Sequence, residues 1–145
     1  MTTSFLFQKV LELLLKKLNA MHKDLSATDI TSAELSTIAV EALNDMKAQS
    51  VKCMDVRHLT SVTDLMILAT GRSDRHVRAL AESVIESCKL AGQRPLGLEG
   101  KDTGEWVLVD LSDVVVHVML PKVREFYDLE KMWSVELPLH EQAAI

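Results

Sequence analysis

The sequence is poor in the residues that build metal, redox and base-stacking sites. Two of its 145 residues are cysteines, and its aromatic residues are three Phe, two Trp and one Tyr. Cys53 and Cys88 lie in apolar stretches without CxxC or Cys/His spacing, so we expect two buried thiols and no disulfide framework. The aromatic residues are not interleaved with basic ones, as a stacking platform for nucleic acid requires.

Catalytic signatures are missing as well. No GxSxG, Walker A or GxGxxG pattern is present. Asp110 and Asp113 are separated by a tight turn, so they do not form the paired carboxylates that hold metal ions in nucleotidyltransferases. The histidines show no metal-ligand spacing, and His117, alone in an apolar strand, is expected to be a core or face residue. The sequence therefore predicts a protein that is not an enzyme and has no metal or cofactor.

No apolar run is long enough to span a membrane. The run at residues 5–18 is interrupted by Lys9 and Glu12, and it lacks the marks of a secretory or mitochondrial leader. We expect residues 1–30 to be an amphipathic helix and linker, with Met21 as an alternative start. These absences predict a cytoplasmic protein without a membrane partner.

The composition is that of one soluble domain, with 48% apolar and 26% charged residues. The net charge is −5, and residues 1–31 have a balance of +1, which leaves −6 for the rest. An acidic body disfavours broad binding to a phosphate backbone, because that mode depends on Lys and Arg. A basic protein is the easier partner.

Apolar periodicity predicts three helices in the body of the chain. Thr31 and Glu34 fit a capping box at the first helix start, and Val123, Phe126 and Tyr127 are expected on one side of the last. The predicted helices span residues 32–49, Ser73 to Gly92, and Pro121 to about Trp133.

Five strands are predicted between and after the first two helices. The last two are separated by Ser112 and Asp113, which forces an antiparallel hairpin, and the strand after the second helix is expected to close a parallel crossover. We therefore predict an α/β fold with a mixed five-stranded sheet flanked by helices, a domain at 31–134 and a loosely attached tail at 135–145. The predicted strands span residues 51–56, 64–70, 94–98, 106–111 and 114–120.

Two clusters are candidates for binding. The Gly-Ser turn at residues 71–73 opens a helix and carries nearby cations, which fits either a solvated basic turn or a contact with an anion or RNA phosphate. The segment 99–113 places five carboxylates around Trp106, which fits either a docking site for a basic protein or a polar loop with Trp106 in the core. The candidate anion contacts are Arg72, Ser73, Arg75 and His76.

Several ordered blocks between Ser36 and Trp133 resemble the ribosomal silencing factor family, RsfS or Iojap. The blocks are Asp64-Leu-Met-Ile-Leu-Ala-Thr-Gly71, Ser73-Asp-Arg-His-Val77, Pro95-Leu-Gly-Leu-Glu-Gly100, Glu105-Trp-Val-Leu-Val-Asp-Leu-Ser-Asp-Val-Val-Val-His-Val-Met119 and Phe126-Tyr-Asp-Leu-Glu-Lys-Met-Trp133. The segment 1–31 has no counterpart in short members of the family.

This resemblance implies a nucleotidyltransferase-like fold (αβα) without transfer chemistry. It also implies binding to the large-subunit ribosomal protein uL-fourteen, which blocks subunit joining and represses translation when nutrients are short, and a homodimer in the free state. The alternatives are a large-subunit assembly factor with the same docking site or a degenerate nucleotide-binding protein, and a minor contact with ribosomal RNA is possible. The expected partner contacts are Trp106, Glu99, Glu105, Asp110 and Tyr127.

Overall fold

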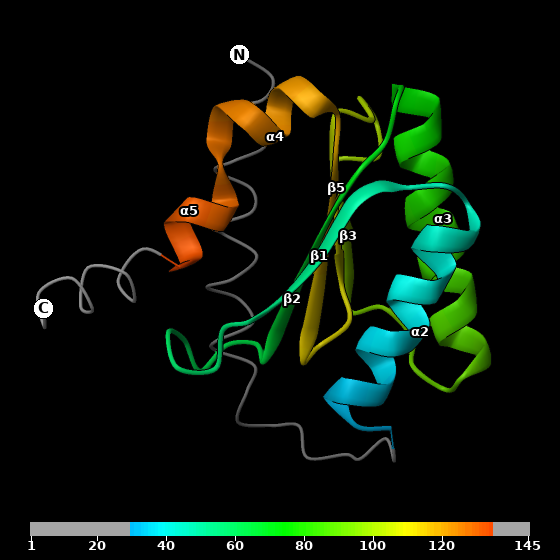
Figure 1. Cartoon of the computed structure of the whole chain (residues 1–145). Coiled ribbons are helices and arrows are strands. Elements are labelled where there is room, and N and C mark those ends of the chain that lie inside the picture. The colour runs from blue at the N-terminus through cyan, green and yellow to red at the C-terminus, as the bar shows by residue number, and fades with distance from the viewer. Residues whose placement is uncertain (1–29, 135–145) are drawn as a thin grey trace, which may run out of the picture.

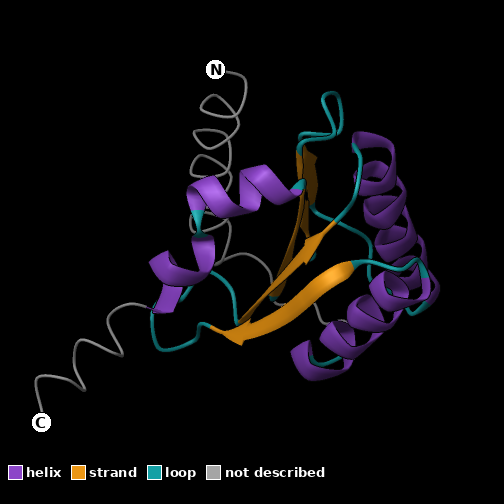
Figure 2. Ribbon diagram, turned by 45° about the horizontal axis from the view of Figure 1, so that its top comes forward, coloured by secondary structure: helices purple, strands orange, loops and turns teal. Residues whose placement is uncertain are grey.

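The computed structural model describes residues 30–134 and shows one sheet with helices on both faces (Figure 1). Helices α2 and α3 cover one face, and the short helices α4 and α5 lie on the other side, as the turned view also shows (Figure 2). None of the helices in the described part of the chain is long and apolar enough to cross a membrane. The elements are α2 (Ser32–Asp45), β1 (Gln49–Asp55), β2 (Leu65–Thr70), α3 (Asp74–Leu90), β3 (Gly97–Glu99), β4 (Trp106–Asp110), β5 (Val114–Met119), α4 (Pro121–Tyr127) and α5 (Leu129–Ser134).

The sheet has the strand order β1-β2-β5-β4-β3. Strands β2 and β5 are parallel, and the other three pairings are antiparallel. This confirms the predicted mixed five-stranded α/β fold and the β4–β5 hairpin. The predicted N-terminal helix and C-terminal tail lie outside the described residues.

The face under α2 and α3 is a continuous apolar layer. Alternate residues of the central strands point to it, as the two-residue period of a strand requires. Gly71 lets the chain pass close to α3, because a Cβ there would lie 2.7 Å from Val77 Cγ2. The buried residues of this layer include Leu35, Ala39, Leu43, Ile67, Val77, Leu80, Val84, Val107, Val109 and Val116.

The opposite face has a second, smaller core. Its buried residues are Val56, Met66, Leu68, Trp106, Leu108, Val115, Met119, Val123 and Leu129, against which Tyr127 packs. Helix α4 contributes Val123 and α5 contributes Leu129. The central strands β2, β4 and β5 are thus covered on both faces, which explains their unbroken apolar runs.

Helix boundaries differ from the sequence prediction at two places. The first helix ends at Asp45 rather than near 49, because Lys47 takes a left-handed conformation with φ 61°. The capping box of Thr31 and Glu34 is present as predicted. The predicted last helix is two helices, since Asp128 breaks it with φ 45° and ψ 58°.

The strand after α3 is also shorter than predicted. It spans Gly97–Glu99 and pairs with β4 at the sheet edge, so it does not lie beside β2. Both β4 and β5 stand between them. The two strands nevertheless run in the same direction, as the predicted parallel crossover requires.

Candidate docking site

Trp106 is in the core and is not an exposed anchor. Its side chain is 0% exposed, and its ring lies 5.1 Å from that of Tyr127, centre to centre. The reason is topological, because β4 is an interior strand and every one of its residues is buried. The expectation that Trp106 contacts a partner directly is wrong for this conformation, and the core alternative is the one that the structure shows.

A buried hydrogen bond fixes the indole of Trp106. Its Nε1–H donates to His117 Nδ1 at 3.0 Å, so a neutral His117 carries its proton on Nε2. Burial lowers the pKa of His117 to about 3, because the charged form loses its hydration. This confirms that His117 is a satisfied core residue.

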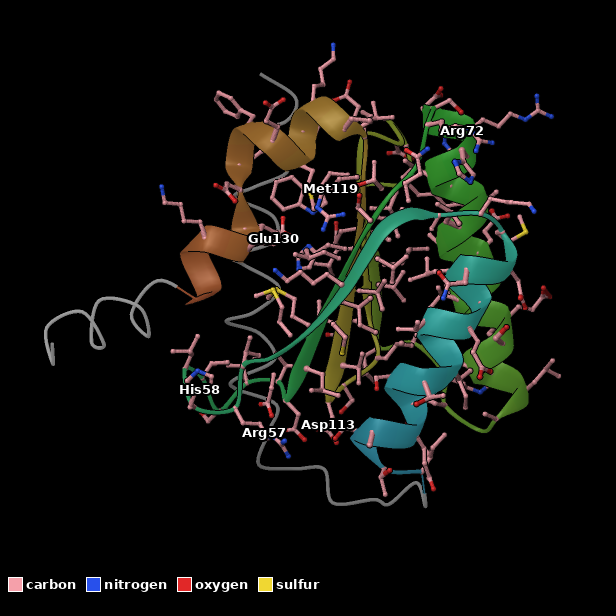
Figure 3. All side chains as sticks on the ribbon, viewed as in Figure 1. Arg57, His58, Arg72, Asp113, Met119 and Glu130 are labelled. Carbon is pink, nitrogen blue, oxygen red and sulfur yellow. The ribbon has the colours of Figure 1, made fainter. Side chains whose placement is uncertain are left out.

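The acidic segment around Trp106 does not form one rim. Asp110 is 3% exposed, and its Oδ1 accepts a hydrogen bond from the Ser112 backbone N–H at 2.9 Å. It therefore shapes the β4–β5 turn, which corrects the prediction of a partner contact. Strand β4 separates the carboxylates that precede Trp106 from Asp110 and Asp113, which lie at the β4–β5 turn. This turn is at the opposite end of the sheet from Arg72 (Figure 3).

The other predicted contacts are accessible in part. Glu99, Glu105 and Tyr127 are each partly exposed. Glu99 pairs with Leu108 across the strands and so shares the face of Trp106. The Glu105 carbonyl accepts a hydrogen bond from Leu120 N–H at 3.0 Å, which places Glu105 beside the start of α4.

Phe126 also differs from the sequence prediction. It was expected on the apolar side of the last helix with Val123 and Tyr127, but it is 77% exposed. Its ring meets Tyr127 edge to face at 4.8 Å. Spacing alone gives no signal of this exposure, because residues three and four positions after Val123 both lie on its side of a helix. The exposed aromatic residue therefore belongs to α4.

Arg124 attaches α4 and α5 to the sheet. Its guanidinium donates to both carboxylate oxygens of Glu130 at 3.1 Å, to the Ser50 carbonyl at 2.6 Å and to Thr70 Oγ1 at 2.9 Å. Hydrogen bonding to Arg124 lowers the pKa of Glu130. We call these contacts of Arg124 the clasp. A cleft of about 380 Å³ lies beside it, and the lining of the cleft includes Gln49, Pro121 and Glu125.

Several hydrogen bonds within the fold shape the start of α3. The Arg72 N–H donates to His76 Nδ1 at 2.9 Å, and Ser73 Oγ accepts from His76 N–H at 3.1 Å, as predicted for a Ser73 cap. The other ring nitrogen of His76 lies 2.9 Å from the Met46 carbonyl. Arg72, Ser73 and Arg75 are exposed, and of the four candidates only Arg72 and Arg75 have side chains that take no part in these hydrogen bonds.

The cysteines differ in environment. Cys88 is buried, and desolvation raises its pKa to about 11, which fits the predicted structural thiol. Cys53 is exposed on β1, so the prediction that it is buried is wrong. The edge position of β1 explains this. Within residues 30–134, no group of three or more His, Cys, Asp or Glu side chains could hold a metal ion.

The fold defines a small α/β module with an exposed aromatic side chain on a short helix beside one sheet face. The chain belongs to the ribosomal silencing factor family, since residues 29–144 match the family described as "Ribosomal silencing factor during starvation". This confirms the resemblance seen in the sequence.

Individual relatives agree with the family assignment. Ribosomal silencing factor RsfS of Chromobacterium violaceum is 51% identical over 105 residues, which cover 72% of this chain and 86% of that protein. A crystal structure of a Chromobacterium violaceum protein has a TM-score of 0.71 at 50% identity and covers 72% of this chain and 88% of that one. The mouse protein "Mitochondrial assembly of ribosomal large subunit protein 1" is 32% identical over 99 residues, which cover 66% of this chain and 43% of the mouse protein.

Proposed function

We propose that this protein is a steric regulator of the ribosome that binds the large subunit through ribosomal protein uL-fourteen, prevents the small subunit from joining and so represses translation in the cytoplasm under nutrient limitation. Membership of the silencing-factor family supports the role. No catalysis is needed, because a folded body at the intersubunit face is itself the obstacle. The free chain is expected to be a homodimer, which sedimentation velocity tests.

The observation that carries this proposal is an exposed aromatic ring on a rigid support. Phe126 is 77% exposed and stacks edge to face on Tyr127, whose ring in turn lies against buried Trp106. A rigid aromatic side chain loses little conformational entropy on binding, so it is suited to be an interface hot spot. Trp106 is thus a positioning residue beneath the surface.

Carboxylates around this ring fit a basic partner. Glu125 on α4 and Asp128 at its C-cap flank the Phe126–Tyr127 pair and are exposed, while Glu105 lies beside the helix start and is partly exposed. Opposite charges across an interface raise the association rate and select the partner. We call the surface made by Glu105, Glu125, Phe126, Tyr127 and Asp128 the docking surface. Glu99 lies on the same sheet face and borders it.

Sedimentation of purified subunits tests the function. In a sucrose gradient of both subunits, we expect added protein to abolish the joined-ribosome peak and to migrate with the large subunit. A joined peak of unchanged size, with the protein left at the top of the gradient, would contradict the proposal.

A pair of matched variants tests the docking surface. Phe126→Ala is expected to weaken binding to large subunits and to isolated uL-fourteen by at least about thirtyfold, the effect of losing an aromatic hot spot. Leu90→Ala is the control, because Leu90 is 88% exposed on α3 and lies outside the docking surface. Equal binding by the two variants would remove Phe126 from the interface.

A large-subunit assembly factor is the second candidate, favoured by the name of the mouse relative. Such a factor uses the same docking surface but binds earlier, on immature particles. Cells depleted of the protein would then accumulate large-subunit precursors, whereas a silencing factor alone would leave their assembly unchanged and alter survival in starvation.

A further inference from the structure

Positive side chains gather at one end of the sheet, away from the turn that holds Asp113. Parallel strands β2 and β5 both end there, and Arg72 is seen at this end in Figure 3. A hydrogen bond links the two strand ends, since the N–H of Gly71, directly after β2, donates to the carbonyl of Met119, the last residue of β5, at 3.0 Å. We call Lys47, Arg72, Arg75 and Lys122, which are all exposed, the basic end.

Contacts within the fold hold the backbone of the basic end in place. His76 links the Arg72 backbone to the Met46 carbonyl, so Lys47 follows directly after a residue that is bound to this turn. Lys122 is in the first turn of α4, which begins directly after Leu120. The four cations therefore come from three loops and helix ends that are fixed relative to one another.

These cations have no counter-ion in the described part of the chain. Asp74, which precedes Arg75 in the chain, pairs instead with Arg78 at 3.0 Å. No ion pair joins any of the four cations to a described acidic residue. The basic end thus retains its charge for an external anion, although the chain as a whole has a net charge of −5.

The position of the two arginines is unfavourable for folding alone. Arg72 and Arg75 flank the N-terminus of α3, where the helix dipole disfavours positive charge. Lys89, in contrast, is in the last turn of the same helix, where the dipole favours it. The helix dipole thus explains the position of Lys89 but not the positions of the two arginines. This difference points to an intermolecular role for the arginines.

We propose that the basic end binds phosphate groups of large-subunit ribosomal RNA while the docking surface holds the ribosomal protein. This rests on the proposed function and adds a second point of attachment. The two surfaces adjoin on α4, with Lys122 in its first turn and Phe126 in its second. Four exposed cations without an ion pair in the described residues suit a phosphate backbone. The contact is local, because it involves four side chains of a chain whose net charge is −5.

Salt dependence separates this contact from the docking surface. Each phosphate contact contributes about 0.7 to 0.9 to the slope of log affinity against log salt. We expect the double substitution Arg72→Gln and Arg75→Gln to make this negative slope shallower by about 1.4 to 1.8 for purified large subunits. The same substitution should weaken binding about tenfold at low salt. The matched control is Lys89→Gln with Arg94→Gln, which removes the same charge near the other end of α3.

Binding to isolated uL-fourteen distinguishes the two proposals. The arginine variant is expected to bind that protein with unchanged affinity, whereas Phe126→Ala weakens both interactions. Equal salt slopes for the arginine variant and its control would overturn the basic end as an RNA contact and leave the docking surface intact. Failure of the unaltered protein to bind uL-fourteen, with subunit binding still sensitive to the arginines, would overturn the docking surface instead.

A photo-crosslink identifies the anion. With p-benzoylphenylalanine in place of Arg75, irradiation of the complex with large subunits is expected to join the protein to ribosomal RNA. The same group in place of Lys89 is the control and should give no RNA adduct. A crosslink from position 75 to an acidic ribosomal protein would overturn the RNA assignment.

Discussion

The two faces of the sheet are built differently. The face under α2 and α3 is sealed by two long helices and contains apolar side chains in a continuous layer. The other face is covered in part by two short helices, and it buries the Trp106–His117 hydrogen bond. A polar clasp around Arg124 joins its covering helices to each other through Glu130 and to the sheet through Ser50 and Thr70.

This difference separates stability from recognition. The helices of the first face bury their apolar stripes against the strands, so this face mainly stabilises the fold, apart from the exposed arginines at the start of α3. The second face carries an exposed ring, Phe126, which packs on Tyr127, and Tyr127 in turn lies against the buried ring of Trp106. We infer that the Trp106–His117 and Arg124–Glu130 hydrogen bonds keep Phe126 and the nearby carboxylates at fixed positions. Apolar packing alone would fix these positions less specifically.

The largest effect is expected from Trp106→Ala. Removal of a fully buried Trp costs about 3 to 5 kcal/mol in free energy of unfolding, and the variant also leaves His117 Nδ1 without its donor. Urea denaturation at neutral pH measures this loss. A change below about 1 kcal/mol would contradict the burial of Trp106 and restore it as a surface anchor.

A pH-dependent effect is expected from His117. Its folded pKa of about 3 lies below the usual value of 6.5, so the unfolded state binds more protons between these values and stability falls as the pH falls. His117 should account for a loss of about 2 kcal/mol between about pH 7 and about pH 5. Urea denaturation of His117→Gln at both pH values should show a correspondingly smaller difference.

The matched control for this test is His58→Gln. His58 is exposed, so its substitution should leave the pH dependence of the unfolding free energy nearly unchanged. If both variants keep the full dependence of the unaltered protein, then His117 is not the buried neutral residue that the second face requires.

The first face was largely predictable from the sequence. Its helices show apolar residues at spacings of three and four, and their caps, Thr31 and Ser73, were identified correctly. Periodicity works there because each helix has one buried side. The helix end at Asp45 was missed because it depends on the left-handed conformation of Lys47, for which the local sequence has no glycine signal.

The second face was predicted less well, for a physical reason. Trp106 lies next to an acidic loop in the sequence, but strand pairing turns its side chain into the core and carries Asp110 to the far end of β4. Phe126 became exposed because Asp128 breaks the helix and α4 packs through Val123 and Tyr127. Such features depend on long-range packing, which residue order alone does not specify.

A smaller effect is expected from the clasp. Because Arg124 lowers the pKa of Glu130, the ionised carboxylate stabilises the fold above its unfolded pKa, and this contribution is lost as the pH falls through the folded value. Glu130→Gln should cost about 1 kcal/mol near neutral pH, as measured by urea denaturation. The difference from the unaltered protein should shrink below roughly pH 4.3. Glu125→Gln is the control, because Glu125 is exposed on α4; an equal loss in both variants would show that the clasp does not hold the helices.

The smallest effect on stability is expected from Phe126→Ala. Its ring is 77% exposed, so the free energy of unfolding should change by no more than about 0.5 kcal/mol, in contrast to Trp106→Ala beneath it. Thermal and urea denaturation measure this directly. If the same variant binds large subunits at least about thirtyfold more weakly, the loss lies in the contact and not in the fold. A destabilisation as large as that of Trp106→Ala would instead mean that the two rings form one core, and the division between a supporting layer and a contacting layer would fail.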